Sequence, residues 1–146
     1  VPGASDRVRV LIVAGEPVAG ALLGMLLDPA RYDPVFPQAG EQPHEALARL
    51  GTPLVLLLDG TLPAADTDAL FERATASGVV IVLFAPPARA PEVDGLARRR
   101  AVGAFALPID QAGLSAVLAA AAARAASSGL WMLAAVVPHL GAVAGG

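Results

Sequence analysis

Five short apolar runs alternate with helical patterns along the chain. The runs occupy residues 8–13, 34–37, 54–58, 79–84 and 104–107, and we expect each of them to form a β-strand. The run 54–58 contains only leucine and valine, without alternating polar residues. A strand that is apolar on both faces is typical of a parallel sheet covered by helices on both sides.

The segments between and after these runs have helical periodicity. We expect helices over 17–28, 41–50, 66–78, 91–101 and from after Asp110 to about 127. Asp66 or Thr67 is a good N-cap, and the three arginines at 98–100 suit a helix C-terminus. The β-α order predicts right-handed crossovers and an α/β fold: a flavodoxin-like, doubly wound, five-stranded parallel sheet in the order 2-1-3-4-5 with a C-terminal tail.

The domain organisation follows from this pattern. We expect residues 1–6 to be a disordered remnant, 7–127 to be one domain, and 128–146 to be a linker or tail helix towards an output domain that these residues do not contain. The apolar stretch 130–144 is interrupted by Pro138 and His139 and falls short of the roughly 18 residues that span a bilayer. No targeting segment is apparent, so we expect a cytoplasmic protein without a membrane partner.

Composition excludes several kinds of chemistry. The 146 residues include 10 basic and 13 acidic side chains, a net charge of -3, no cysteine and no lysine. Thiolate metal sites, cysteine nucleophiles, Schiff bases and a P-loop lysine are therefore excluded. His44 and His139 lie far apart in sequence, so we predict no metal site and no cofactor. The mild acidity gives no electrostatic footprint for nucleic acid.

Functional residues of doubly wound sheets gather at the carboxyl ends of the strands. Asp59 is the ionisable residue immediately at such an end, and Glu16 lies a few residues beyond another. General acid-base catalysis needs a second titrating group, and a cation needs two or three carboxylate oxygens. We therefore predict that the protein is not an enzyme.

Four motifs occur in a consistent order along the chain. They are the run 10–13 followed by Glu16-Pro17, the run 56–58 followed by Asp59-Gly60-Thr61-Leu62-Pro63, the run 80–83, and Leu107-Pro108. Together they resemble a response-regulator receiver domain over about residues 7–127. The resemblance implies that Asp59 stands at the phosphoacceptor position and that Pro108 stands at the position of a cis proline.

The other signature positions of that family carry different residues here. Where receivers have an acidic pair, a strand-4 hydroxyl, a switch aromatic and a lysine, this sequence has, in turn, Ala14 and Gly15, Phe84, Ala104, and Leu107. We expect Phe84 to fill the phosphate position with apolar volume, and no arginine to lie near a strand end. The resemblance thus indicates a degenerate pseudo-receiver, in which Asp59 either takes phosphate or anion, or is a carboxylate hydrogen-bonded to backbone N–H groups.

The first helix has almost no polar face. A helix that is apolar all round must be buried on both sides, so a partner is expected opposite the sheet. Gly20 and Gly24 would let another helix approach closely, and the alanine-rich fifth helix flanks the same side of the sheet. We predict a homodimer through helices 17–28 and 111–127, with a face formed by Val18, Leu22, Leu23, Met25 and Leu26.

Two functions compete at this point. The first is a phosphorylation-independent, atypical receiver that acts as a dimerisation and signalling module for transcription control. The tail loosely resembles, at Gly129 and Trp131, the linker of response regulators with a helix-turn-helix output domain, through which alone DNA would be bound. The alternative is a receiver-derived small-molecule sensor with an apolar pocket near Ala14, Gly15, Phe84 and Leu107. A chain that still accepts phosphate at Asp59 is a third, less favoured hypothesis.

Overall fold

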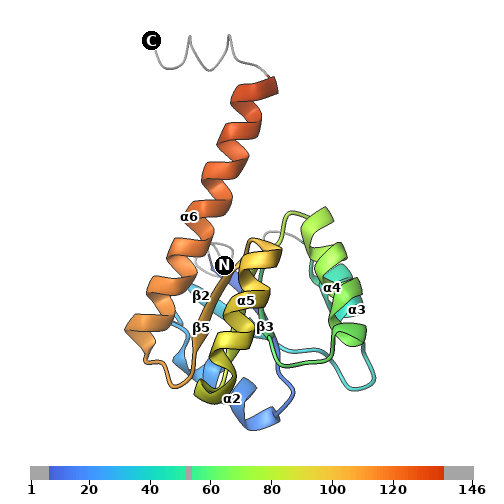
Figure 1. The fold of residues 1–146 in the computed structure, drawn as a ribbon, viewed down its shortest axis with the longest axis vertical. Coiled ribbons are helices and arrows are strands. Elements are labelled where there is room, and N and C mark those ends of the chain that lie inside the picture. The colour runs from blue at the N-terminus through green and yellow to red at the C-terminus, as the bar shows by residue number, and fades with distance from the viewer. Residues whose placement is uncertain (1–6, 52–53, 137–146) are drawn as a thin grey trace.

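The computed structural model describes residues 7–51 and 54–136 and contains a five-stranded sheet with helices on both faces (Figure 1). All paired strands are parallel, and their order is β2-β1-β3-β4-β5, as predicted. The elements in chain order are β1 (Val8–Val13), α2 (Pro17–Leu26), β2 (Tyr32–Val35), α3 (Pro43–Leu50), β3 (Leu54–Asp59), α4 (Ala64–Ala76), β4 (Val80–Ala85), the 3₁₀ turn η1 (Pro87–Arg89), α5 (Ala90–Arg100), β5 (Gly103–Ala106) and α6 (Gln111–Val136).

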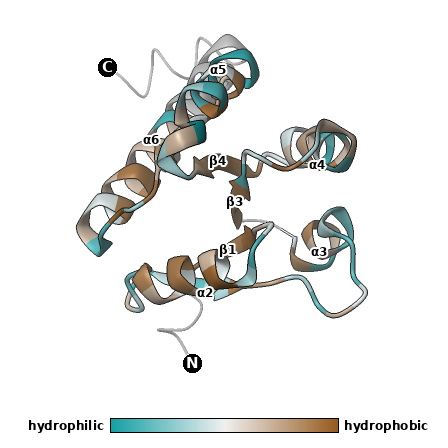
Figure 2. Ribbon diagram, turned by 60° about the horizontal axis from the view of Figure 1, so that its bottom comes forward, coloured by the Kyte–Doolittle hydropathy of each residue, from teal (hydrophilic) through white to brown (hydrophobic). Residues whose placement is uncertain are grey.

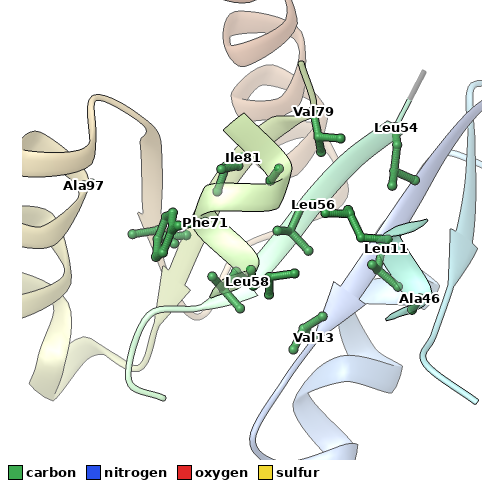
Figure 3. Packing of buried hydrophobic residues seen from close by; sticks show 14 of the residues in the cluster. Leu11, Val13, Ala46, Leu54, Leu56, Leu58, Phe71, Val79, Ile81 and Ala97 are labelled. Carbon is green, nitrogen blue, oxygen red and sulfur yellow. The ribbon is translucent and has the colours of Figure 1, made fainter. Parts of the chain in front are cut away.

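Each face of the sheet has its own apolar core. On one face, Leu11, Leu56 and Leu58 of the inner strands pack against α3, α4 and α5 (Figure 3). On the other face, Val10, Ile12, Leu57 and Val82 pack against α2 and α6. Figure 2 shows these two helices on that side of the sheet. Side chains alternate between the faces of a strand, and all six residues of β3 are buried, so both faces of the strand before Asp59 must be apolar. This double burial explains the unbroken apolar run 54–58.

Several element boundaries differ from the sequence prediction, among them the starts of three elements. Strand β2 begins at Tyr32, which is buried, rather than at residue 34. Helix α3 begins at Pro43, because Gln42 and Glu45 form a capping box there. Helix α4 begins at Ala64, so Thr67 is not its N-cap: its buried hydroxyl donates to the carbonyl of Pro63, four residues earlier.

Helix α6 is longer than predicted. It has 26 residues and projects well past the sheet (Figure 1), so the expected domain boundary at 127/128 falls inside a helix. Leu114, Leu118 and Ala121 anchor its first half on the sheet. Gly129 and Trp131 belong to the second half, whereas residues 1–6 and 137–146 lie outside the described part. Across the described ranges, no helix is long and apolar enough to cross a membrane.

Candidate functional site

Asp59 ends β3 at the carboxyl edge of the sheet, and its carboxylate is held by three hydrogen bonds. The backbone N–H of Gly15 donates to Oδ2 at 3.0 Å. The backbone N–H of Thr61 and the Thr61 hydroxyl donate to Oδ1 at 2.9 and 2.7 Å. The residue is only 8% exposed. The carboxylate therefore accepts hydrogen bonds from backbone N–H groups of the loops that follow β1 and β3, and from one hydroxyl.

The loop after β1 provides a backbone donor where a receiver has carboxylates. Ala14 lies at the end of β1 and packs against the core under α2, while Gly15 contacts Asp59 through its N–H. A Cβ on Gly15 would lie 3.2 Å from Asp59 Oδ2 and from Leu62 Cδ2, so glycine permits this close approach. Glu16 is exposed and makes no side-chain cap to α2. Within the described residues, no three His, Asp or Glu side chains converge on a possible metal position.

Phe84 is a core residue. Strand β4 ends at Ala85, one residue later than predicted, so Phe84 is its last residue but one. Phe84 packs with Leu114 and Leu118 on the α6 face and stacks on Phe105, with ring centroids 6.1 Å apart. Ala85 faces the opposite core. The register pairs Phe84 of β4 with Asp59 of β3, so the two side chains lie on the same face of the sheet, where Phe84 is buried as an apolar side chain.

Strand β5 leads into a cis peptide bond between Leu107 and Pro108, the isomer implied by the resemblance. Leu107 packs partly against the core that contains Phe84. Ala104 packs partly on the other core, next to α5, and carries no ring at that position. The aromatic residue of β5 is Phe105, which faces α6 instead.

An arginine that sequence reasoning missed follows the carboxyl end of β4, within range of the charge of Asp59. Arg89 ends the short turn η1, only four residues after β4. The hydrogen bond and charge of Glu92 raise the pKa of the Arg89 guanidinium, and the charge of Asp59 contributes a smaller increase. The expectation that no arginine lies near a strand end is therefore wrong. Only three residues separate Arg89 from the end of β4, and this short separation is the signal that could have placed Arg89 near a strand end.

Arg89 borders a cleft of about 300 Å³ between α4 and α5. Thr61, Leu62 and Thr67 line one wall, and Glu92, Leu96 and Arg99 line the other. Most of its charges are already paired: Arg89 with Glu92 at 2.6 Å, and Asp68 with Arg100 at 2.8 Å. The cleft therefore offers little uncompensated charge to a ligand.

The predicted dimer face separates into exposed and buried residues. Val18, Leu22 and Met25 are 69, 55 and 81% exposed, whereas Leu23 is 1% exposed and Leu26 packs partly against the core. Consecutive residues point about 100° apart on a helix, so Leu23 faces the sheet while Leu22 and Met25 face outward. Leu23 and Leu26 therefore do not belong to the exposed face of α2, contrary to the prediction. We call the exposed set, Val18, Leu22 and Met25, the α2 stripe.

The two glycines of α2 face this chain's own core. A Cβ on Gly24 would lie 3.1 Å from the ring of Phe36, and a Cβ on Gly20 would contact Ala14, Ile12 and Phe36. Their lack of side chains lets the Phe36 ring lie against the helix. The expectation that they admit a helix of another molecule is therefore wrong.

Comparisons with known proteins agree with this architecture. No protein-family model matches the sequence, and no curated protein matches it. Among solved structures, a sensor protein from Polaromonas sp. JS666 is similar, with 28% identity, a TM-score of 0.60, and coverage of 82% of this chain and 98% of that one. A response regulator from Colwellia psychrerythraea is also similar, with 19% identity, a TM-score of 0.53, and coverage of 80% and 98%. The chain has the flavodoxin-like fold of response-regulator receivers.

Proposed function

We propose that this chain is a non-enzymatic signalling module of the receiver type that works without phosphorylation. The observation that carries the proposal is the environment of Asp59. Both carboxylate oxygens accept hydrogen bonds from the chain itself, and Ala14 and Gly15 stand where a cation would need carboxylate ligands. The similarity to a sensor protein and to a response regulator supports the signalling role.

The chemistry of phosphoryl transfer explains why these changes matter. A carboxylate oxygen that attacks a phosphorus must give up hydrogen bonds to its own loop. The incoming phosphoryl oxygens also need a divalent cation to neutralise them, and Mg²⁺ is held by carboxylates. Asp59 alone supplies one such ligand. Leu107 supplies no positive charge, and Arg89 already donates to Glu92.

A phosphodonor assay tests this proposal. We expect no change of intact mass after incubation of the full chain with acetyl phosphate and Mg²⁺, while a phosphorylatable receiver in the same tube gains one phosphate. The Asp59→Asn variant is the matched control, because it keeps the acceptor oxygen but cannot form the acyl phosphate. A gain of one phosphate in the wild type that the variant lacks would overturn the proposal.

The output of such a module would depend on assembly. We propose that the α2 stripe and the outer face of α6 bring two copies together, as both helices lie on the same side of the sheet (Figure 2). Regulation of transcription in the cytoplasm would then follow from a helix-turn-helix output domain in the full protein. Outward-facing Val18, Leu22 and Met25 support the first step of this scheme.

The small-molecule hypothesis does not fit the position first expected for it. Phe84 is fully buried in the α6 core, and Leu107 packs partly against the same core. Because these side chains fill the space, the carboxyl ends of β4 and β5 leave no room for a ligand there, which favours a purely structural role for them. An apolar cleft does exist at the carboxyl end of β1: Ala14, one of the four expected residues, lines it, whereas Gly15, Phe84 and Leu107 do not.

A further inference from the structure

We propose that the apolar cleft at the carboxyl ends of β1 and β2 binds a small, uncharged molecule with an apolar body and one hydrogen-bond donor. The cleft has a volume of about 460 Å³ and lies between the start of α2, the end of β2 and the start of α3. Its walls are formed by apolar residues and one glycine, with a single ionisable side chain, Glu41. The main wall residues are Ile12, Pro17, Gly20, Phe36, Pro37 and Pro43.

The size and lining are those of a small-molecule site. Ligand pockets generally measure about 300–1,000 Å³ and are mostly apolar, with a few fixed polar groups that orient the ligand. Water gains little in such a space, because it finds few polar partners there. An apolar body that displaces this water is stabilised by the area that it buries.

The walls are already in place before any ligand arrives. Pro17, Pro37 and Pro43 have a fixed φ angle and carry no backbone N–H that would need a partner. The ring of Phe36 rests against Gly20 and Gly24 and remains 43% exposed. Binding would therefore order few groups, which lowers its entropic cost.

Glu41 determines the charge that the ligand should carry. Its carboxylate accepts hydrogen bonds from Arg49 at 2.8 and 2.9 Å and from the backbone N–H of Gln38 at 2.9 Å. The guanidinium neutralises the carboxylate, so the wall has no net charge to attract an ion. Glu41 Oε2 accepts one of these bonds and keeps a lone pair, and the side chain is 14% exposed. A neutral donor such as a hydroxyl or an amine N–H is the matching group.

Fluorescence titration of the full chain tests this proposal. The probe is N-phenyl-1-naphthylamine, which is uncharged, aromatic and carries one N–H, and whose emission rises in apolar surroundings. We expect saturable binding of one probe per chain. Competition by 1-phenoxynaphthalene, which has the same shape but no donor, should be about tenfold weaker, as expected for the loss of one hydrogen bond to a charged acceptor.

Two variants locate the site. Ala21 lines the cleft and is exposed, so Ala21→Phe fills the cleft without disturbing the core, and it should abolish binding. Ala69→Phe on the exposed face of α4 is the control and should bind as the wild type does. Far-UV circular dichroism of both variants establishes that they fold.

Other outcomes would overturn the proposal. Non-saturable binding, or binding that survives Ala21→Phe, would show that the probe does not occupy the cleft. Loss of binding in Met25→Gln, which alters the α2 stripe outside the cleft, would place the probe on that stripe. Binding that strengthens when the protein is diluted would show that a second copy of the chain occupies the cleft instead. None of these results depends on whether Asp59 accepts phosphate.

Discussion

A single glycine, Gly60, sets how closely α5 approaches the loop that follows Asp59. A Cβ at this position would lie 2.5 and 2.9 Å from the two methyl groups of Val93, which is 1% exposed. Val93 is β-branched and fully packed, so it cannot move aside. We expect Gly60→Ala to lower the free energy of unfolding by about 1–3 kcal/mol, measured by urea denaturation, because it overpacks a closed interface.

Two further variants distinguish overpacking from a general effect of losing glycine. Gly95→Ala lies within α5, where a Cβ would have only Arg99 Nη1 nearby, at 3.5 Å. We expect it to stabilise the protein by about 0.5–1 kcal/mol, because alanine is the better helix former. In Val93→Ala the added cost of Gly60→Ala should be small. An equal cost in both backgrounds would contradict the proposed clash.

The positions of the residues around Asp59 could be predicted only in part from the sequence. The placement of Asp59 at a strand end followed from the apolar run before it, and the cis bond at Pro108 followed from the family resemblance. The end of β4 was predicted one residue early, at Phe84 instead of Ala85, because an alanine does not mark the end of an apolar run. Arg89 was missed because its proximity to Asp59 depends on the path of the turn after β4.

At the scale of elements, α2 shows how apolar periodicity fails when almost every position is apolar. No polar residue within α2 indicates its orientation, and only packing shows that Leu23 faces the sheet while Leu22 faces outward. We therefore expect Leu23→Ala to cost about 2–5 kcal/mol of unfolding free energy. Leu22→Ala, measured under conditions in which the chain is a monomer, should change it by less than about 0.5 kcal/mol. Similar costs for both substitutions would mean that the orientation of α2 is wrong.

We expect the ion pair between Glu41 and Arg49, near the start of α3, to make the stability of the protein depend on pH in the acidic range. The hydrogen bond from Arg49, followed by that from the Gln38 N–H, lowers the pKa of Glu41 from 4.5 to about 2. A carboxyl whose pKa is lowered by folding stabilises the folded state above its unfolded value of 4.5. This stabilisation is lost as the pH falls towards 2.

Comparison of the wild type with Glu41→Gln measures this contribution. The urea midpoint of the wild type should exceed that of the variant by a constant amount above pH 5, and the difference should shrink below pH 4.5. Glu92→Gln is a comparison at a more exposed pair, whose side chains are 47 and 61% exposed, and it should show a smaller effect. A difference that does not vary with pH would exclude the ion pair as its source.

At the scale of the whole molecule, topology was the most predictable feature. Strands and helices alternate along the chain, and the strands are too apolar to be buried on one face only. Because βαβ crossovers are right-handed, few topologies of a parallel sheet agree with this pattern. The register of β3 between β1 and β4 then places Asp59 at the carboxyl edge. The length of α6 was not predicted, since Ser127-Ser128-Gly129 is typical of a helix C-terminus, whereas the helix continues through it to Val136.

The last prediction concerns the α2 stripe, which includes three of the four large hydrophobic side chains that are exposed in the described residues. Burying such side chains is worth about 25 cal/mol per Å², from which the entropy of association must be subtracted. We expect light scattering at micromolar concentrations to give twice the monomer mass. The double substitution Leu22→Glu and Met25→Glu should give the monomer mass, because it would bury two carboxylates without partners, whereas Ala69→Glu on α4 should leave the dimer intact. A wild-type protein that stays monomeric up to millimolar concentrations would show that the stripe does not bind a second copy.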